Sequence, residues 1–187
     1  MSSPIAYSEL HAHSAFSLLD GASSPEALVA RAHELGLCAL TVVDQDDLGG
    51  AVRLHRAARE VGLPVVHGAS LTLEDGSSLP LLVRDREGWG NLCRLVSLAR
   101  TTSPRGAPRT SLERLSAHSG GLLALTGDAR GPLARALARD DEPRALTILG
   151  RLVEVFGRDH LRVEVGNHHL PWERRLAERL VTLSRRS

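Results

Sequence analysis

The stretch that decides the fold is CALTVVDQDDLGGAVRLHRAAREVGLPVV, residues 38–66. Residues 38–43 are a β-branched apolar run with the length of a buried strand. Residues 47–61 repeat apolar side chains at helical spacing, which predicts a helix that ends at Gly62. A further short strand begins at Val65. A strand, a helix and a strand in this order predict a parallel βαβ unit.

The same alternation continues on both sides of this unit. We expect strands over residues 5–11, 122–125 and 161–165, a hairpin over residues 70–84, and helices over residues 24–35, 86–99, 110–116, 130–138, 142–156 and 171–185. The hairpin is expected to turn at Asp75-Gly76, and residues 100–109 are expected to form an exposed loop. We therefore predict one α/β domain over residues 1–187, built on a parallel sheet. In such folds, side chains with chemical roles gather at the carboxyl ends of the strands.

The composition is that of an ordinary globular protein, with 42% hydrophobic residues, 24% charged residues and a formal net charge of +1. It excludes a disordered or collagen-like chain. We predict a cytoplasmic protein, because no apolar run has the length of a membrane span and the N-terminus lacks the signal-peptide pattern. All 23 basic residues are arginine, which excludes a Schiff-base or phosphate-loop lysine. The two cysteines, Cys38 and Cys93, lie far apart, so a metal ion must be held by histidine and carboxylate side chains.

The clearest chemical pattern lies in residues 9–23, ELHAHSAFSLLDGAS. Successive side chains of a strand point to opposite faces, so His11 and His13 are expected to leave the strand on the same side, about 7 Å apart. Two neutral imidazoles in that arrangement can bind one divalent ion, and Asp20 in the following loop adds an oxygen ligand. We therefore predict a metal site at His11, His13 and Asp20. The alternative is that an isolated His-x-His pair has no chemical role.

Together with this motif, three further segments resemble, in order, the PHP (polymerase and histidinol phosphatase) domain: residues 35–73, 86–100 and 120–133. The resemblance covers roughly residues 5–165 and is closest to the PHP domains of bacterial DNA polymerase III alpha subunits and error-prone DNA polymerases. It implies a distorted, TIM-like (β/α)7 barrel, which would here be truncated at its C-terminal end. It also implies a cluster of divalent metal ions (Zn, Mn or Mg) that hydrolyses phosphoesters, in polymerases as a 3′–5′ exonuclease.

The resemblance also indicates which metal ligands are replaced. The family's Asp-His pair after the second strand is Asp44-Gln45 here, and Ser70 stands where a glutamate is expected. Asp128 occupies a position that often holds Cys or His, and we expect it either to bind a metal ion or to cap the next helix. The family's Asp-x-His pair beyond the strand at residues 161–165 does not occur in this sequence.

Other polar residues near these motifs are expected to have structural roles. We interpret His67 as a strand-end or loop residue rather than a ligand, and His168 and His169 as surface residues. Asp47 is expected to cap a helix that begins at residue 48, and Asp46 is expected to be solvated.

The replaced ligands favour a degenerate, non-catalytic PHP domain with a structural or partner-binding role in DNA replication or repair. Its expected partners are a DNA polymerase or other replication subunits. The alternative is an active, metal-dependent phosphoesterase or 3′–5′ exonuclease. A third hypothesis is an amidohydrolase-type barrel, which also opens with His-x-His, although members that need a carbamylated lysine are excluded. DNA synthesis is not expected, because the resemblance ends before any polymerase region.

The sequence offers one candidate contact with DNA. Arg100, Arg105, Arg109 and Arg114 lie in and after the loop at residues 100–109, where they can reach phosphates. The alternative is that they are solvated loop charges. With one Tyr, two Phe and two Trp, the chain has no aromatic platform of the kind that binds single strands.

Overall fold

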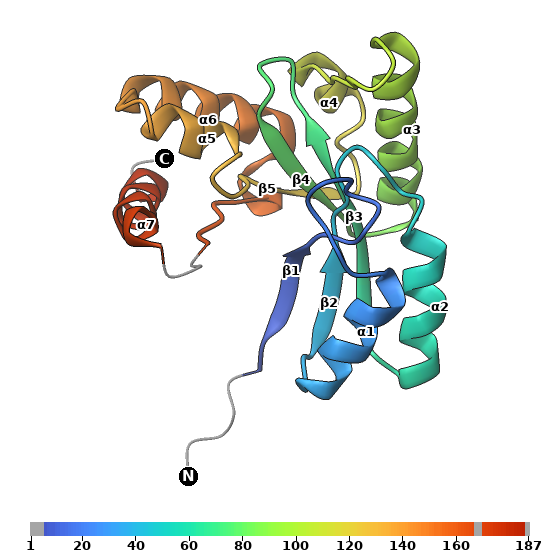
Figure 1. Ribbon diagram of the computed structural model, residues 1–187. Coiled ribbons are helices and arrows are strands. Elements are labelled where there is room, and N and C mark those ends of the chain that lie inside the picture. Colours follow the sequence, from blue (N-terminus) through green and yellow to red (C-terminus); the bar gives the residue numbers. More distant parts are fainter. Residues whose placement is uncertain (1–5, 167–169, 186–187) are drawn as a thin grey trace.

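The structure is a computed structural model that describes residues 6–166 and 170–185. Within these residues, six strands form one sheet in the order β1-β2-β3-β4-β5-β6, so each strand pairs with its neighbours in the sequence. The strands are β1 (Ser8–Ala12), β2 (Ala39–Val42), β3 (Val65–Thr72), β4 (Ser78–Val83), β5 (Leu122–Leu125) and β6 (Leu161–Arg162). The sheet curls into part of a TIM-like barrel (Figure 1), which confirms the predicted α/β fold class.

The strand directions fit the sequence pattern. β1, β2 and β3 run parallel, as do β5 and β6, whereas β4 is antiparallel to both of its neighbours. The β3–β4 pair is the predicted hairpin, and Gly76 in its turn has a φ of 78°, which glycine adopts without steric cost. The sheet is therefore parallel except for one reversed strand.

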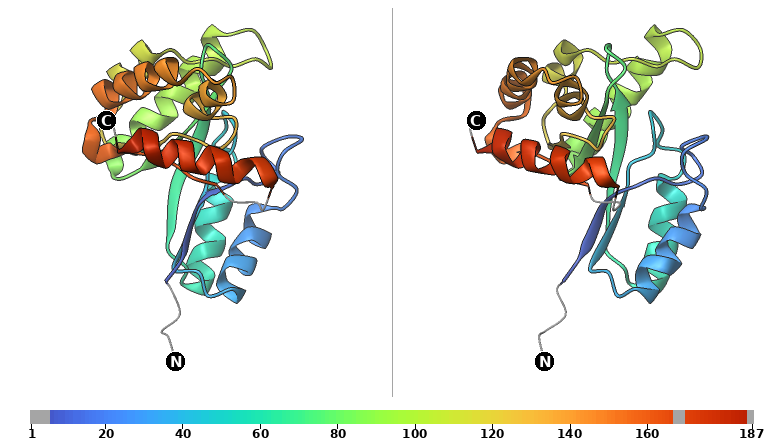
Figure 2. Two further views of the ribbon diagram at one scale, coloured as in Figure 1. Left: turned by 90° about the vertical axis from the view of Figure 1, so that its left-hand side faces the viewer. Right: turned by 60° about the vertical axis from the view of Figure 1, so that its left-hand side comes forward.

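Seven α-helices surround this sheet in the described part of the chain. They are α1 (Pro25–Glu34), α2 (Ala51–Val61), α3 (Arg86–Thr102), α4 (Leu112–Ala117), α5 (Pro132–Leu137), α6 (Glu142–Phe156) and α7 (Pro171–Ser184). A short 3-10 helix, η1 (Arg158–His160), precedes β6. In the right-hand view of Figure 2, α7 lies on the opposite side of the sheet from α1 and α2. None of the helices in residues 6–166 and 170–185 is long and apolar enough to cross a bilayer.

Side-chain caps account for the start of two of the helices. Ser24 accepts a hydrogen bond from the backbone N–H of Ala27, and Pro25 occupies the first turn of α1. Asp141 accepts from the N–H of Arg144 and starts α6.

Several predicted boundaries are wrong. The helix predicted over residues 86–99 continues to Thr102, so the first three residues of the loop predicted over residues 100–109 are helical. The helix predicted over residues 47–61 begins only at Ala51, because residues 46 and 47 are held by other parts of the fold. The helix predicted from residue 110 begins after Ser111, because the N–H of Thr110 bonds to the carbonyl of Thr72 at the end of β3. The strand predicted over residues 161–165 pairs with β5 over two residues only.

Apolar side chains fill the space between the sheet and its helices in two main clusters. The larger one joins β3, β4 and β5 to α3, α5 and α6, and it includes the fully buried Leu81, Leu95 and Leu149. The second cluster packs α1 and α2 against β2, around Val29, Leu40 and Leu54.

Candidate metal centre

The loop after β1 is folded around one buried carboxylate. His11 lies on β1 and His13 just beyond its end, and their ring centroids are 5.2 Å apart. Asp44, which follows β2, accepts hydrogen bonds from the backbone N–H and the hydroxyl of Ser14 (2.7 and 2.6 Å) and from the hydroxyl of Ser17 (2.7 Å). The two imidazoles therefore lie side by side, while Asp44 fixes the shape of the loop that carries them.

His11 reaches across the open side of the partial barrel. Its Nδ1 is 2.6 Å from Oε1 of Glu164, which follows β6 at the other edge of the sheet. Only 12% and 17% of the two side chains are exposed. Burial lowers the pKa of His11, but the hydrogen bond and the charge of Glu164 outweigh it, so this pKa is raised above its ordinary value. The pair is a charge-assisted hydrogen bond that joins the two edge strands of the sheet.

His13 is held at both ring nitrogens. Nδ1 lies 2.9 Å from the hydroxyl of Ser17, and Nε2 lies 3.3 Å from a terminal nitrogen of Arg130. A guanidinium group only donates hydrogen bonds, so Nε2 accepts and Nδ1 carries the ring proton. Burial, together with the charge of His11, lowers the pKa of His13, which favours this neutral form.

The two predicted carboxylate ligands turn to the same arginine. Oδ2 of Asp20 is 2.8 Å from Nη1 of Arg130. Asp128, after β5, accepts from the backbone N–H of Arg130 at 2.8 Å, and its other oxygen is 3.6 Å from Nε of Arg130. The helix that follows begins at Pro132 after Gly131, so Asp128 does not cap it.

The residues at the two replaced ligand positions lie side by side inside the fold. Gln45 and Ser70 form an isolated parallel bridge between the segments that contain them. The amide nitrogen of Gln45 donates to the carbonyl of Ser70 (3.1 Å) and to the hydroxyl of Thr72 (2.8 Å), and its amide oxygen accepts from the hydroxyl of Ser78 (3.0 Å). Ser70 is fully buried. Gln45 therefore connects the ends of β2, β3 and β4.

The two expectations for the carboxylates after Gln45 are wrong. Asp46 is not solvated: it is 5% exposed and accepts hydrogen bonds from the N–H and the hydroxyl of Thr72. Asp47 does not cap a helix at residue 48, because its carboxylate pairs with the guanidinium of Arg100. Both side chains bind partners that are distant in the sequence.

His67 has packing partners rather than ligand neighbours. It lies within β3, with its ring centroid 5.7 Å from that of His55 and 5.4 Å from that of Trp89. Burial, together with the charge of His55, lowers the pKa of His67. The predicted position at a strand end or in a loop is therefore wrong, because His67 is an interior residue of β3. His168 and His169 lie outside the described residues.

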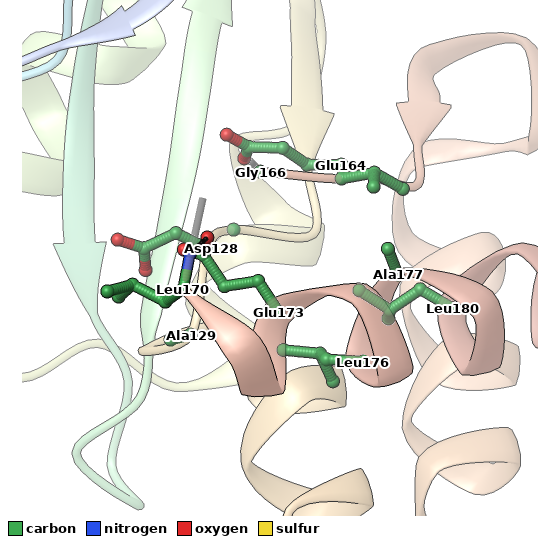
Figure 3. Close-up of a pocket in the computed structure, with 11 residues that line it drawn as sticks. Asp128, Ala129, Glu164, Gly166, Leu170, Glu173, Leu176, Ala177 and Leu180 are labelled. Atoms are coloured by element: carbon green, nitrogen blue, oxygen red, sulfur yellow. Dashed lines mark hydrogen bonds between the residues drawn. The ribbon is translucent and has the colours of Figure 1, made fainter. Parts of the chain in front are cut away.

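A cavity of about 150 Å³ adjoins this centre, between α7 and the ends of β5 and β6. Figure 3 shows Leu176, Ala177 and Leu180 of α7 on one side and Glu164 on the other. Glu164 uses Oε1 for His11, and its buried Oε2 has no hydrogen-bond partner among the described residues. The cavity is therefore mostly apolar, and its lining also includes the acidic residues Asp128, Glu164 and Glu173.

These side chains do not fit the metal cluster that the family resemblance implies. A divalent ion needs several ligand atoms aimed at one point. Across residues 6–166 and 170–185, no three His, Cys, Asp or Glu side chains are arranged to hold an ion. Instead, Asp20 and Asp128 contact Arg130, and Nε2 of His13 accepts from the same group.

Comparison with known proteins gives the family. The family model of the PHP domain matches residues 9–168. The chain belongs to the PHP domain family. The match begins at β1 and extends beyond β6, so it includes the whole described sheet except the first residue of β1.

Relatives of this PHP domain are named error-prone DNA polymerases. The protein from Mycobacterium bovis is 39% identical in an alignment of 181 positions that covers 90% of this chain. The protein from Alkalilimnicola ehrlichii is 38% identical in an alignment of 186 positions that covers 98% of this chain. In both cases the match spans 17% of the relative's own length.

Solved structures share the fold of this PHP domain. A Bifidobacterium adolescentis protein, named a "putative metal-dependent phosphoesterase", has a TM-score of 0.65 at 17% identity, covering 99% of this chain and 85% of its own. An amidohydrolase from Chromobacterium violaceum, with bound sulfate and no metal, has the same TM-score and identity, covering 97% of this chain and 84% of its own. At this identity the likeness establishes the fold alone.

Two residues of the PHP domain's centre were not identified from the sequence. Glu164 follows a predicted strand, so the rule that chemical groups gather at strand ends could have indicated it. Arg130 lies in the loop after β5, but its charge gave no sign that it contacts Asp20 and His13, which are far away in the sequence.

The arginines proposed to contact DNA have different environments. Arg100 is bound to Asp47 and donates to the carbonyl of Asp46 at 2.9 Å. Arg105 is exposed, and Arg109 and Arg114 line an open surface groove with Arg151. Arg100 thus contacts other parts of the fold, while the other three predicted residues face the surface or the groove.

Proposed function

We propose that this chain is a non-hydrolytic PHP domain that acts as a structural or partner-binding module of an error-prone type of DNA polymerase. Its similarity to such polymerases over 90% or more of its own length supports the polymerase context. Because it spans only 17% of their length, the partner in this proposal is the remainder of a polymerase or another replication or repair subunit. A cytoplasmic location follows from that role.

The observation that carries the proposal is that the residues at the two replaced ligand positions, Gln45 and Ser70, are part of the packed and hydrogen-bonded interior. Gln45 has both ends of its amide in hydrogen bonds to β3 and β4, so turning it toward an ion would break them. Ser70 is fully buried and presents no carboxylate. A neutral amide oxygen and a hydroxyl are also poorer ligands for a divalent transition metal than imidazole and carboxylate. Phosphoester hydrolysis by a metal cluster would lack two of its ligands here.

Hydrolysis assays test this proposal. The chain is incubated with Mn²⁺ or Zn²⁺ and either p-nitrophenyl phosphate or a 3′-labelled single-stranded oligonucleotide. We expect no turnover above that of a variant in which His11 and His13 are both replaced by alanine. Metal-dependent turnover that the double variant loses would overturn the proposal.

The alternative, a metal-dependent phosphoesterase, is favoured by one observation. Nδ1 of His11 bonds to a carboxylate, and this arrangement is common for histidines whose other nitrogen binds a metal ion. Turnover that depends on His11 in the assays above would establish this alternative.

Contact with DNA is a separate part of the proposal and rests on the arginines at the surface. The groove that contains Arg109 and Arg114 also contains Glu74 and Glu113, so its charge is mixed. We expect weak, salt-dependent binding of a labelled oligonucleotide, measured by fluorescence anisotropy, that decreases when Arg105 and Arg109 are replaced by alanine. Binding that is unchanged in this double variant would remove the DNA contact from the proposal.

A further inference from the structure

Three of the four predicted metal ligands contact a single guanidinium group, that of Arg130. Arg130 contacts Asp20 through Nη1 at 2.8 Å, His13 through Nη2 at 3.3 Å and Asp128 through Nε at 3.6 Å. The three partners follow two different strands, β1 and β5. The point on which they converge is therefore already occupied by a positive group of the chain itself.

We propose that the guanidinium of Arg130 takes the place of a divalent metal ion among His13, Asp20 and Asp128 and excludes the ion from that place. This inference deepens the proposed function, and it rests on that proposal for the view that these side chains stand at former ligand positions. It assigns a role to Arg130 that neither the family match nor the relatives' names imply.

The charges and the hydrogen bonds fit this role. A guanidinium is positive at all physiological pH values and donates in several directions within one plane, which suits two carboxylates and one imidazole around it. Its charge is fixed to the chain, so a divalent ion that entered the same space would be repelled at close range. The ion would also have to displace Arg130 from Asp20 and Asp128.

The conformation of the loop after β5 fixes the position of Arg130. Gly127 has a φ of 81°, and a Cβ at Gly131 would lie 2.1 Å from the carbonyl oxygen of Thr126. The loop is therefore so tight that glycine is needed at both ends. Within it, Asp128 binds the backbone N–H of Arg130 at 2.8 Å and fixes the start of the side chain.

The hydrogen bond from Arg130 to His13 also occupies the nitrogen lone pair with which His13 would bind a metal ion. Because Nε2 of His13 accepts from Arg130, its Nδ1–H donates to Ser17. The hydroxyl of Ser17 donates in turn to the buried Asp44. This chain of hydrogen bonds, Arg130 to His13 to Ser17 to Asp44, leaves His13 with no free nitrogen for an ion.

Calorimetric titration with Mn²⁺ tests the proposal on the full chain and on Arg130→Ala. We expect Arg130→Ala to bind one Mn²⁺ at least tenfold more tightly than the unmodified chain. The gain should disappear when His13→Ala is added. Arg139→Ala, an exposed arginine just beyond the end of α5, is the matched control and should bind Mn²⁺ as the unmodified chain does. If Arg130→Ala does not fold by circular dichroism, Arg130→Gln replaces it, because Gln removes the charge and keeps part of the side chain.

The site of binding is checked by NMR, since Mn²⁺ broadens the resonances of nearby nuclei. In Arg130→Ala, we expect Mn²⁺ to broaden the ring signals of His11 and His13 before those of His67. Equal Mn²⁺ affinity in the unmodified chain and Arg130→Ala, or a gain that survives His13→Ala, overturns the inference. Hydrolysis by the unmodified chain overturns the proposed function instead. The two failures are distinguishable because one concerns binding and the other turnover.

Discussion

The contact between His11 and Glu164 makes a pH-dependent prediction for the variant Glu164→Gln. Glutamine keeps the shape and one acceptor oxygen but removes the charge that faces Nδ1 of His11 at 2.6 Å. A hydrogen bond to a charged group contributes about 1.5–3 kcal/mol, and both side chains are more than four-fifths buried. We therefore expect Glu164→Gln to lower the free energy of unfolding by about 2 kcal/mol near pH 6.

The pH dependence follows from the raised pKa of His11. Burial lowers this pKa, but the hydrogen bond and the charge of Glu164 raise it by more than burial lowers it. The folded protein therefore binds the His11 proton more tightly than the unfolded chain does. The stabilisation is fully present below the ordinary histidine value of 6.5 and is lost as the pH rises through the raised value in the folded state. The difference between the unmodified chain and Glu164→Gln should therefore shrink to about 1 kcal/mol at pH 9.

Urea denaturation at pH 6 and pH 9 measures both differences. With a slope of about 2 kcal/mol per molar urea, the midpoint should shift by about 1 M at pH 6. The matched control is Glu178→Gln, which removes one member of an exposed pair with Arg174 and should change the free energy by less than about 0.5 kcal/mol. A loss of the same size at both pH values, or one no larger than the control's, would refute the reasoning.

Three further predictions concern stability and use matched variants or a direct probe. In α3, Gly88→Ala should cost about 2 kcal/mol or more in urea denaturation, because its Cβ would lie 1.9 Å from a backbone oxygen, whereas Gly90→Ala, with nothing within 4 Å, should gain about 0.5–1 kcal/mol. Leu19 is fully exposed with a φ of 66°, so thermal denaturation should show that Leu19→Gly stabilises the protein relative to Leu18→Gly. Asp44→Asn should lower the free energy of unfolding by about 2 kcal/mol and make residues 13–21 susceptible to limited proteolysis, because three accepted hydrogen bonds are disturbed. Equal effects of the two glycine variants or of the two leucine variants, or an Asp44→Asn loop that resists protease as before, would contradict these expectations.

Much of the fold could be predicted from periodicity and caps. The strand over residues 122–125 and the helix over residues 142–156 have the predicted bounds, because apolar spacing and local capping decide them. The segment at residues 46–50 could not be predicted in this way. A carboxylate before an apolar run resembles a helix cap, but Asp46 and Asp47 bind Thr72 and Arg100, and the sequence does not reveal such distant partners.

The candidate site was predictable only in part. The period of a strand is enough to place His11 and His13 on one side of the sheet, although their rings lie closer than expected, 5.2 Å between centroids, because the strand ends at Ala12. The loss of ligands at Gln45 and Ser70 was visible from the resemblance. The position of Arg130 was not, because it depends on how far the sheet curls to bring the loop after β5 to the loop after β1.

The reversed direction of β4 has a consequence for the outer surface. Because β4 is antiparallel to its neighbours, it ends at the rim of the sheet opposite the one that carries His11 and His13. The helix that follows, α3, therefore runs back along the sheet toward the histidines. Its last turns then meet Asp46 and Asp47 through Arg100, and Thr110 bonds to the end of β3. The arginine-bearing segment between α3 and α4 is thereby brought to the same rim as the candidate centre. Two segments that are far apart in the sequence, one near the start of the chain and one past its middle, thus share one rim of the sheet.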